Sequence, residues 1–418
     1  MVLAAGLMRV RMGQVPGTPL AACLFCMGAI VRVSVVASSC RADGYKLRHM
    51  RVFNCDHCGH LVFFDSVRCL HCGSELAFLP DQMSMAALTP APQDGPDLWR
   101  RRGRRGTSEY SGRLYRMCRH HTNLQACNFA VPANDFDDLC VSCRQTRVLP
   151  DLSDASNLRR WKQVEAAKRQ LFYTLARLGL EPVPGTAGPV FEFLADLPGG
   201  PPVITGHLGG TITLNVAEAD DDERARRRIA LGEPYRTLIG HLRHESGHFY
   251  WDQLVRDGGQ LDGFRAVFGD ERADYGAALN AHYARGMDLG DWAARHVSAY
   301  AASHPWEDWA ETWAHYLHML DLLETAASYQ TGVTVPDPNS PARHHVTDPF
   351  AVPRPLFQDM VRQWVPLTLM LNSLNRSLGQ DDAYPFALSS GAMVKLRFVH
   401  DLVQAQFLRR ASQAGTPG

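Results

Sequence analysis

The stretch that decides the fold is Thr237-Leu238-Ile239-Gly240-His241-Leu242-Arg243-His244-Glu245-Ser246-Gly247-His248-Phe249-Tyr250-Trp251, which contains one H-E-x-x-H motif. Its apolar residues recur at helical spacing, and the histidines fall on a separate polar stripe. Residues four apart on a helix point to one side, so His244 and His248 can bind one zinc ion. Glu245 then lies within reach of a water at the metal, as the general base of a metallopeptidase requires.

The motif alone also fits a pair of ordinary surface or core histidines, so a third ligand is required. Downstream, Trp306, Trp309 and Trp313 begin an apolar helical stripe, and a second stripe carries Glu307, Glu311 and His315. Small alanines border the second stripe and permit another helix to approach. Carboxylates set between tryptophans and alanines indicate a buried polar site and favour metal ligation. The competing ligand is Glu271, which also precedes a helix after His248.

Eight of the eleven cysteines fall into two groups of four. The first group is a pair of C-x-x-C-G turns, typical of a zinc ribbon, and consists of Cys55, Cys58, Cys69 and Cys72. The second is less regular and consists of Cys118, Cys127, Cys140 and Cys143. His120 or His121 could replace one of its thiolates, and ligands of the two groups could interleave. We therefore expect one or two structural zinc ions in residues 50–150, in a unit that can dock a protein partner.

Composition argues against several classes of partner and location. Lys plus Arg and Asp plus Glu both number 43, so no net charge attracts nucleic acid or an anionic membrane. The basic run 100–105 and the surrounding 80–108 are expected to form a solvated linker. Arg32 interrupts the apolar stretch 20–37, so no membrane span is expected. Metal-like cysteine spacing favours a reducing, cytoplasmic location, with residues 1–49 an unstructured extension.

The remaining pattern predicts a mainly helical region with a small sheet. Helices are expected over 156–178, 356–378 and 393–408, and strands over 191–193 and 211–216, the two strands joined by a turn. The metal helix is expected to begin near Pro234 and to end at Gly258-Gly259. A strand before that helix can pair with an extended peptide substrate.

At these residues the chain resembles the putative zinc-binding metallopeptidase family that carries an N-terminal zinc ribbon. The resemblance covers about 50–408 and rests on the ribbon start, the metal helix and several downstream stretches, among them Ile212-Thr213-Leu214-Asn215, Arg243-His244-Glu245-Ser246-Gly247-His248, His304-Pro305-Trp306-Glu307-Asp308-Trp309-Ala310-Glu311 and Leu371-Asn372-Ser373-Leu374-Asn375-Arg376. The motif is also similar to the gluzincin pattern. That similarity implies that Glu307 binds the zinc and that Glu311, one turn later, supports a ligand histidine.

These observations predict an α+β protein: a zinc-ribbon region at 50–150, a zincin-like catalytic domain at 151–410 and a flexible tail at 411–418. The expected activity is hydrolysis of a peptide or protein substrate, with one catalytic zinc bound by His244, His248 and Glu307 and with Glu245 as base. Tyr316, His315 and Tyr275 are unranked candidates for an oxyanion donor. The alternative is a non-catalytic zinc-binding protein that recruits a partner through its ribbon.

Overall fold

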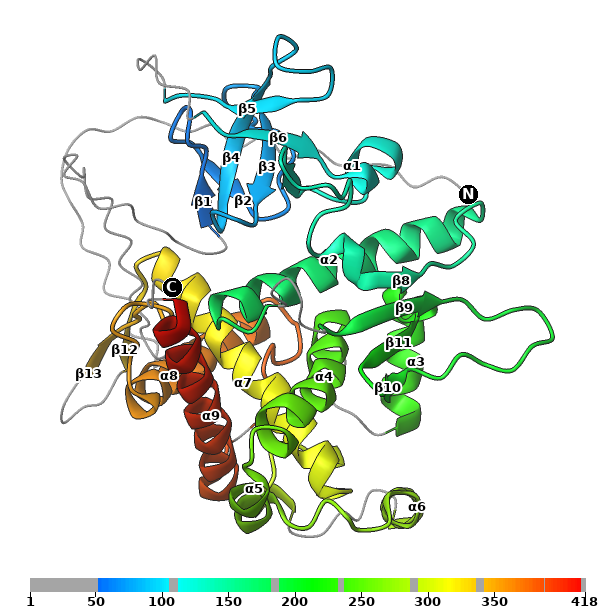
Figure 1. Cartoon of the computed structure of the whole chain (residues 1–418). Coiled ribbons are helices and arrows are strands. Elements are labelled where there is room, and N and C mark those ends of the chain that lie inside the picture. Colours follow the sequence, from blue (N-terminus) through cyan, green and yellow to red (C-terminus); the bar gives the residue numbers. More distant parts are fainter. Residues whose placement is uncertain are drawn as a thin grey trace, which may run out of the picture.

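A computed structural model of the chain describes residues 52–104, 112–181, 188–231, 237–285, 292–335, 342–386 and 388–414. The expected N-terminal extension, 1–49, lies outside these residues, as does Pro234. Figure 1 shows the N-terminal strands above one end of the long helix α2 (Ala155–Arg177), with the helical region below it. A strand-rich N-terminal region followed by a mainly helical region with small sheets confirms the predicted α+β class.

The N-terminal region consists of a small hairpin and a five-stranded antiparallel sheet. The hairpin pairs β1 (Val52–Asn54) with β2 (Leu61–Phe63). The sheet has the order β3-β4-β5-β6-β7, formed by Glu75–Leu79, Ser84–Pro90, Trp99–Arg101, Leu114–Met117 and Ala130–Pro132. Helix α1 (Arg119–Leu124) lies between β6 and β7, and η1 (Cys143–Gln145) and β8 (Thr146–Val148) follow the sheet.

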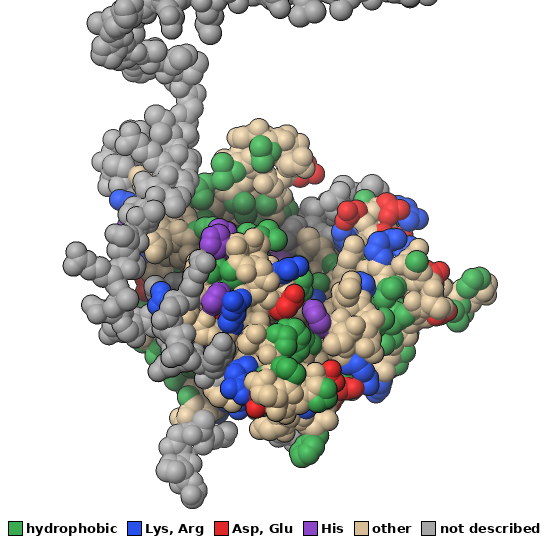
Figure 2. Space-filling model, turned by 90° about the horizontal axis from the view of Figure 1, so that it is seen from above, with side chains coloured by type: hydrophobic (Ala, Val, Ile, Leu, Met, Phe, Trp, Pro, Cys, Tyr) green, Lys and Arg blue, Asp and Glu red, His purple; other side chains and the backbone are tan. Residues whose placement is uncertain are grey.

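The prediction of a linker over 80–108 is wrong for its described part, 80–104, because this stretch supplies β4 and β5. The side chains of Met85 and Leu88 in β4 are almost fully buried. In β5, Arg100 pairs with Asp94 at 2.6 Å and Arg101 with Asp56 at 2.5 Å. Arg100 and Arg101 are thus neutralised within the fold, and Arg105, the last residue of the basic run, lies outside the described residues. In Figure 2, which views the molecule from the ribbon side, basic and acidic side chains are interspersed.

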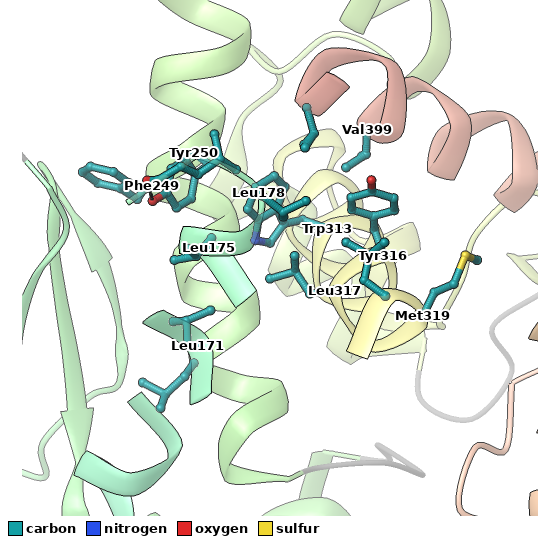
Figure 3. Packing of buried hydrophobic residues seen from close by; sticks show 14 of the residues in the cluster. Leu171, Leu175, Leu178, Phe249, Tyr250, Trp313, Tyr316, Leu317, Met319 and Val399 are labelled. Atoms are coloured by element: carbon teal, nitrogen blue, oxygen red, sulfur yellow. Dashed lines mark hydrogen bonds between the residues drawn. The ribbon is translucent and has the colours of Figure 1, made fainter. Parts of the chain in front are cut away.

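The helical region is built around α2, α4 (Leu238–Trp251) and α7 (Pro305–Ser328). Leu171, Leu175 and Leu178 of the α2 segment face aromatic residues of α4 and α7 in Figure 3. Burying each such leucine contributes about 1.5–3 kcal/mol. The core is completed by α8 (Phe357–Ser377) and α9 (Ser390–Ala414). Residues 411–414 are therefore helical, and only 415–418 of the expected tail lie outside the description.

A four-stranded sheet with the order β10-β11-β9-β8 covers the side of α4. Its inner face packs Phe191 and Phe193 of β9 (Val190–Leu194) and Ile212 and Leu214 of β11 (Thr211–Asn215) into the core. The prediction that β9 and β11 are joined by a turn is wrong, since they run parallel. The Gly209-Gly210 turn instead joins β11 to β10 (Gly206–Leu208), and both glycines adopt positive φ. The edge strand beside the metal helix is thus β10.

Shorter elements complete the chain. They are η2 (Val216–Ala219), α3 (Asp221–Leu231), the π-helical turn η3 (Asp252–Arg256), α5 (Leu261–Phe268), α6 (Tyr275–Arg285), η4 (Trp292–Ala294), η5 (Tyr300–Ala302) and the hairpin of β12 (Gly332–Val335) and β13 (Ala342–His345). No helix within the described ranges is both long and apolar enough to cross a membrane.

Candidate metal centre

Helix α4 presents His241, His244, Glu245 and His248 on one side. Thr237 caps it by accepting a hydrogen bond from the Gly240 amide at 3.0 Å, and the helix continues to Trp251. His244, Glu245 and His248 are all buried, because α7 packs closely across this side of α4. The helix thus carries three titratable side chains into the protein interior, where each needs a compensating partner.

Three of the predicted ligands converge. One ligand atom from each of His244, His248 and Glu307 lies within 4.8 Å of the others. His244 Nε2 is 3.0 Å from Glu307 Oε2, and His248 Nε2 is 3.6 Å from Glu307 Oε1. Glu307 lies in the first turn of α7, which begins with Pro305 after His304 as N-cap. The contact between α4 and α7 therefore closes the long sequence interval between the motif and this carboxylate.

The donor set fits a zinc ion. Two imidazoles and one carboxylate are an established set for catalytic zinc. His248 Nδ1 and Glu245 Oε2 are buried atoms without a hydrogen-bond partner among the described protein groups. Burial opposes charge on His244, but hydrogen bonds to Glu307 and Glu311 outweigh it and hold the pKa of His244 well above its ordinary value. A cation is therefore the species that this cluster of carboxylates stabilises.

Glu311 lies one helical turn after Glu307 and contacts the other ring nitrogen of His244. His244 Nδ1 is 2.7 Å from Glu311 Oε1, and Ser298 Oγ donates to Glu311 Oε2 at 2.6 Å. This arrangement fixes the ring of His244 with Nε2 directed at Glu307, as an orienting carboxylate does in histidine metal sites.

The other sequence candidates lie in different places. Glu271 is outside the cluster and pairs with Arg265, whose Nε is 3.0 Å from Glu271 Oε2. His315 contacts the Tyr384 hydroxyl, and Tyr316 contacts His400 at 3.1 Å, so neither side chain is committed to the metal cluster. Tyr275 alone among the three oxyanion candidates reaches it, since its hydroxyl donates to Glu307 Oε1 at 2.8 Å.

Two further aromatic residues, for which the sequence predicts no role at the metal, border the cluster. The indole of Trp306 lies 3.9 Å from the ring of His248, centre to centre, and His207 of β10 lies 6.1 Å from it. Burial lowers the pKa of His207 to about 4, so this ring is neutral near pH 7. In the sequence, the feature nearest to His207 is the Gly209-Gly210 turn. That turn indicates a hairpin, so it does not indicate that His207 lies at a metal site.

Both cysteine groups form compact clusters. In the first, Cys55 Sγ lies 3.8 Å from Cys72 Sγ, and Cys58 Sγ lies 3.7 Å from Cys69 Sγ. In the second, Cys127 Sγ is 3.8 Å from Cys140 Sγ. Tetrahedral zinc with bonds of about 2.3 Å places thiolates at this kind of separation. The groups do not interleave, and His121 contacts the Cys127 carbonyl at 2.7 Å instead of replacing a thiolate.

Comparison with known protein families matches residues 157–402 to the family described as "Putative zinc-binding metallo-peptidase" and residues 52–154 to a zinc-ribbon domain. The chain belongs to this putative zinc-binding metallopeptidase family. Uncharacterized proteins of Mycobacterium tuberculosis and Mycobacterium bovis are 37% identical to it over 360 residues. The match covers 85% of this chain and 95% of each relative. No solved structure matches.

Membership of the metallopeptidase family confirms the resemblance stated from the sequence and supports zinc binding. The matched ranges also separate the two kinds of metal cluster. Both cysteine groups fall within the zinc-ribbon match, and His244, His248 and Glu307 fall within the metallopeptidase match.

Proposed function

We propose that this chain is a zinc-dependent peptidase whose metal is held by His244, His248 and Glu307. The observation that carries the proposal is the buried convergence of these three ligand groups beside the unpartnered Glu245 Oε2. Zinc, when bound, supplies a Lewis acid that acidifies water and polarises the substrate carbonyl. The two cysteine groups would bind two structural zinc ions, giving three per chain.

Glu245 is the proposed general base. Burial raises its pKa, but the hydrogen bond from His241 and the nearby histidines lower it below the ordinary value. The carboxylate is therefore ionised at neutral pH and able to accept the proton of the attacking water at Oε2. It can then return that proton to the leaving amide nitrogen, which completes hydrolysis without a further acid.

Tyr275 is the proposed donor to the oxyanion. Burial, together with the neighbouring Glu307 carboxylate, raises the pKa of its phenol, so the hydroxyl keeps its proton. A protonated hydroxyl close to a ligand carboxylate is placed to donate a hydrogen bond to charge that develops on the carbonyl oxygen.

The substrate backbone would add to the outer edge of β10, where no described strand pairs with it. This strand pairs on one side with β11, and His207 in its centre faces His248. A pocket of about 400 Å³ beside it is lined by Gly206, His207, Leu208, Thr211, Thr213, Glu192, Arg147 and Ile204. An extended peptide on this edge would place its backbone near the metal ligands and one side chain in this pocket.

Glu245→Gln tests the proposal. The amide keeps the size of the side chain and leaves the three ligands intact, but it cannot accept a proton. Zinc content, counted by native mass spectrometry, should stay constant, while cleavage of a mixed peptide library by the zinc-loaded protein should fall about 10²-fold or more. Unchanged cleavage in the variant would refute the enzyme assignment.

A second function is favoured by exposed apolar side chains on the ribbon. Leu70 is 96% exposed and Phe63 56% exposed, both beside the first cysteine group. Such side chains suit a protein partner. If the wild-type protein holds all three zinc ions yet cleaves no peptide, recruitment of a partner becomes the better account.

A further inference from the structure

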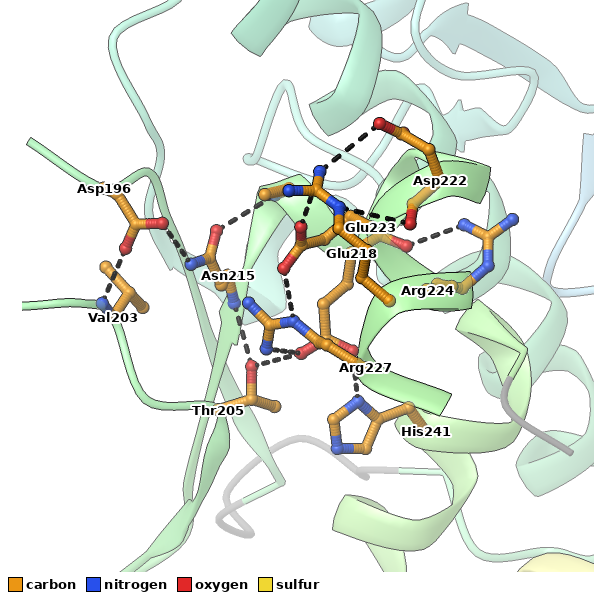
Figure 4. A network of polar contacts seen from close by, with 12 residues as sticks. Asp196, Val203, Thr205, Asn215, Glu218, Asp222, Glu223, Arg224, Arg227 and His241 are labelled. Carbon is orange, nitrogen blue, oxygen red and sulfur yellow. Dashed lines mark hydrogen bonds and ion pairs between the residues drawn. The ribbon is translucent and has the colours of Figure 1, made fainter. Parts of the chain in front are cut away.

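A buried polar network lies behind Glu245 and takes no part in the metal cluster (Figure 4). At its centre, Glu218 of η2 accepts hydrogen bonds from Thr205 Oγ1 at 2.7 Å and from Arg227 Nη1 at 3.1 Å. Both bonds go to Glu218 Oε1. The other oxygen, Oε2, lies 2.7 Å from His241 Nδ1. Glu218 is only 1% exposed, so its position is fixed by these three partners.

His241 connects this network to the proposed base. It lies four residues before Glu245 on α4, hence on the same side of the helix, and His241 Nε2 is 3.2 Å from Glu245 Oε1. Both ring nitrogens thus face carboxylate oxygens, which can only accept. The imidazole of His241 thus connects Glu218, which lies on η2, to the carboxylate of Glu245 on α4.

The contact distinguishes the two oxygens of Glu245. Oε1 is engaged by His241, whereas Oε2 is buried without a hydrogen-bond partner among the described groups. A glutamate has three side-chain torsions, and a general base acts efficiently only when its accepting oxygen is held in place. Holding Oε1 leaves Oε2 as the oxygen presented to the metal centre.

We propose that His241, fixed by Glu218, is a positioning residue that orients Glu245 so that Oε2 accepts the proton of the attacking water. This inference rests on the proposed function. His241 itself touches neither substrate nor reacting atoms, and its effect passes through Glu245.

Two substitutions at His241 separate orientation from packing. The amide of His241→Gln can reach the position of Nε2 and keeps a donor to Glu245. The shorter His241→Asn reaches only the position of Nδ1 and keeps the contact to Glu218. In the zinc-loaded protein, His241→Asn should lower kcat about 10- to 100-fold with little change in KM, and His241→Gln, which keeps the donor to Glu245 but loses the contact to Glu218, should lower kcat less. Equal losses in both variants would overturn the inference.

Glu218→Gln and Asp196→Asn provide the matched pair within the same network. Glu218→Gln weakens the anchor of His241, because a neutral amide is a poorer hydrogen-bond acceptor than a carboxylate, and should lower kcat in the same direction, with zinc content unchanged. Asp196 binds Asn215 and the Val203 amide in Figure 4, but it does not touch His241. Asp196→Asn should therefore leave kcat unchanged, and an equal loss in it would also contradict the assignment.

A measurement independent of activity keeps this inference separate from the peptidase proposal. In a double-mutant cycle on chemical unfolding, His241→Asn and Glu245→Gln should be non-additive, because each removes the same contact. Additive effects would overturn the orientation of Glu245 by His241. If the coupling is present but the wild-type protein cleaves no peptide, the positioning contact stands and the proposed function has failed.

Discussion

Glu307 and Glu271 show how surroundings decide the role of a carboxylate. Both follow His248 in sequence, and sequence reasoning left both as third ligands. Glu307 is 1% exposed and faces two histidines, whereas Glu271 faces the guanidinium of Arg265. A guanidinium keeps its charge, so Glu271 is neutralised without a metal, and Glu307 is the carboxylate that a metal would complete.

We expect Glu307→Gln to reduce zinc retention at the histidine cluster, because a neutral amide is a poor zinc ligand. Glu311→Gln should act more mildly, by about 10-fold in affinity, through loss of the contact that orients His244. Glu271→Gln serves as the matched control and should retain the metal. Competition with a chromogenic chelator measures all three, and loss of zinc from Glu271→Gln alone would reverse the assignment.

The local part of the site could be predicted from sequence and the distant part could not. Helical geometry fixes His244, Glu245 and His248 relative to one another, so their spacing carries the information. Tyr275 and His207 reach the cluster from other elements, and their approach depends on tertiary packing that no local pattern encodes. His241 lay on the predicted polar stripe, but its role appears only through Glu218, on a different element.

At the scale of elements, the metal cluster depends on how closely α4 and α7 approach. Gly247, between the two histidines, lies against α7, and a Cβ added there would stand 2.9 Å from Ala310 Cα and 3.1 Å from Trp313 Cδ1. Trp309 Nε1 also donates to the Gly247 carbonyl at 2.8 Å. The glycine in the motif is thus required by the contact between the two helices.

Gly247→Ala should push the two helices apart, because backbone and indole atoms leave no room for the methyl group. We expect a loss of about 1–3 kcal/mol in the free energy of unfolding, together with weaker zinc binding. Gly276→Ala in α6 is the control, since its nearest contact is 3.6 Å, and it should be neutral or stabilising. Urea unfolding measures both variants. If Gly247→Ala were as stable as the wild-type protein, the close contact between the helices would not be the reason for this glycine.

The same side of α7, one turn beyond Glu311, carries a buried histidine of a different kind, His315. Burial lowers the pKa of His315 to about 4, below the value of about 6.5 that holds in the unfolded chain. Between these values the unfolded state binds the proton and the folded state does not. Stability should therefore fall as the pH drops from about 6.5 to about 4, by about 1.4 kcal/mol per pH unit from this residue.

His315→Asn should flatten that dependence, because asparagine does not titrate and can keep a polar group near the Tyr384 hydroxyl. Urea unfolding at several pH values between 4 and 7 would measure the slope for both proteins. Identical slopes would show that His315 is not the residue responsible.

The ribbon strands mark another limit of sequence reasoning at this scale. Pro90 and Gly95 indicate a loop, yet residues 84–88 pair with β3, with Ala86 opposite Ala77 and Ala87 opposite Leu76. Small side chains such as Ala86 and Ala87 carry a weak strand signal on their own. Burial between neighbouring strands compensates for the weak strand propensity of these alanines. That burial depends on tertiary contacts, so the local sequence does not indicate it.

At the scale of the whole molecule, the ribbon and the helical region share α2. Phe64 and Phe78 of the ribbon pack against Tyr173 of α2 at ring distances of 5.6 and 5.7 Å. The Tyr173 hydroxyl donates to Glu324 of α7 at 3.1 Å. The aromatic cluster around both cysteine groups therefore ends on the helix that also supports α4 and α7.

Cys127→Ser should destabilise more than the ribbon alone. This thiol is 4% exposed, and Arg169 of α2 bonds the carbonyl of the preceding Ala126 at 2.7 Å. Loss of the zinc proposed for the second cysteine group should lower the free energy of unfolding by about 4 kcal/mol or more. It should lower the unfolding midpoint of the helical region as well. Cys58→Ser, at the more exposed first group, should have the smaller effect. Hydrogen exchange of α2 amides distinguishes Cys127→Ser from Cys58→Ser. Unchanged protection of α2 in Cys127→Ser would refute the coupling between the second cysteine group and the helical region.

Arg243, directly before His244, forms a buried ion pair with Asp321 of α7, and Thr174 of α2 donates to the same carboxylate at 2.8 Å. Any rotation of α4 about its axis would separate these groups inside a low-dielectric interior. The orientation of α4, and with it the positions of His244 and His248, is thus fixed before a metal binds. Zinc capture at His244, His248 and Glu307 should consequently be limited by release of the ion's own water shell, and not by rearrangement of the polypeptide.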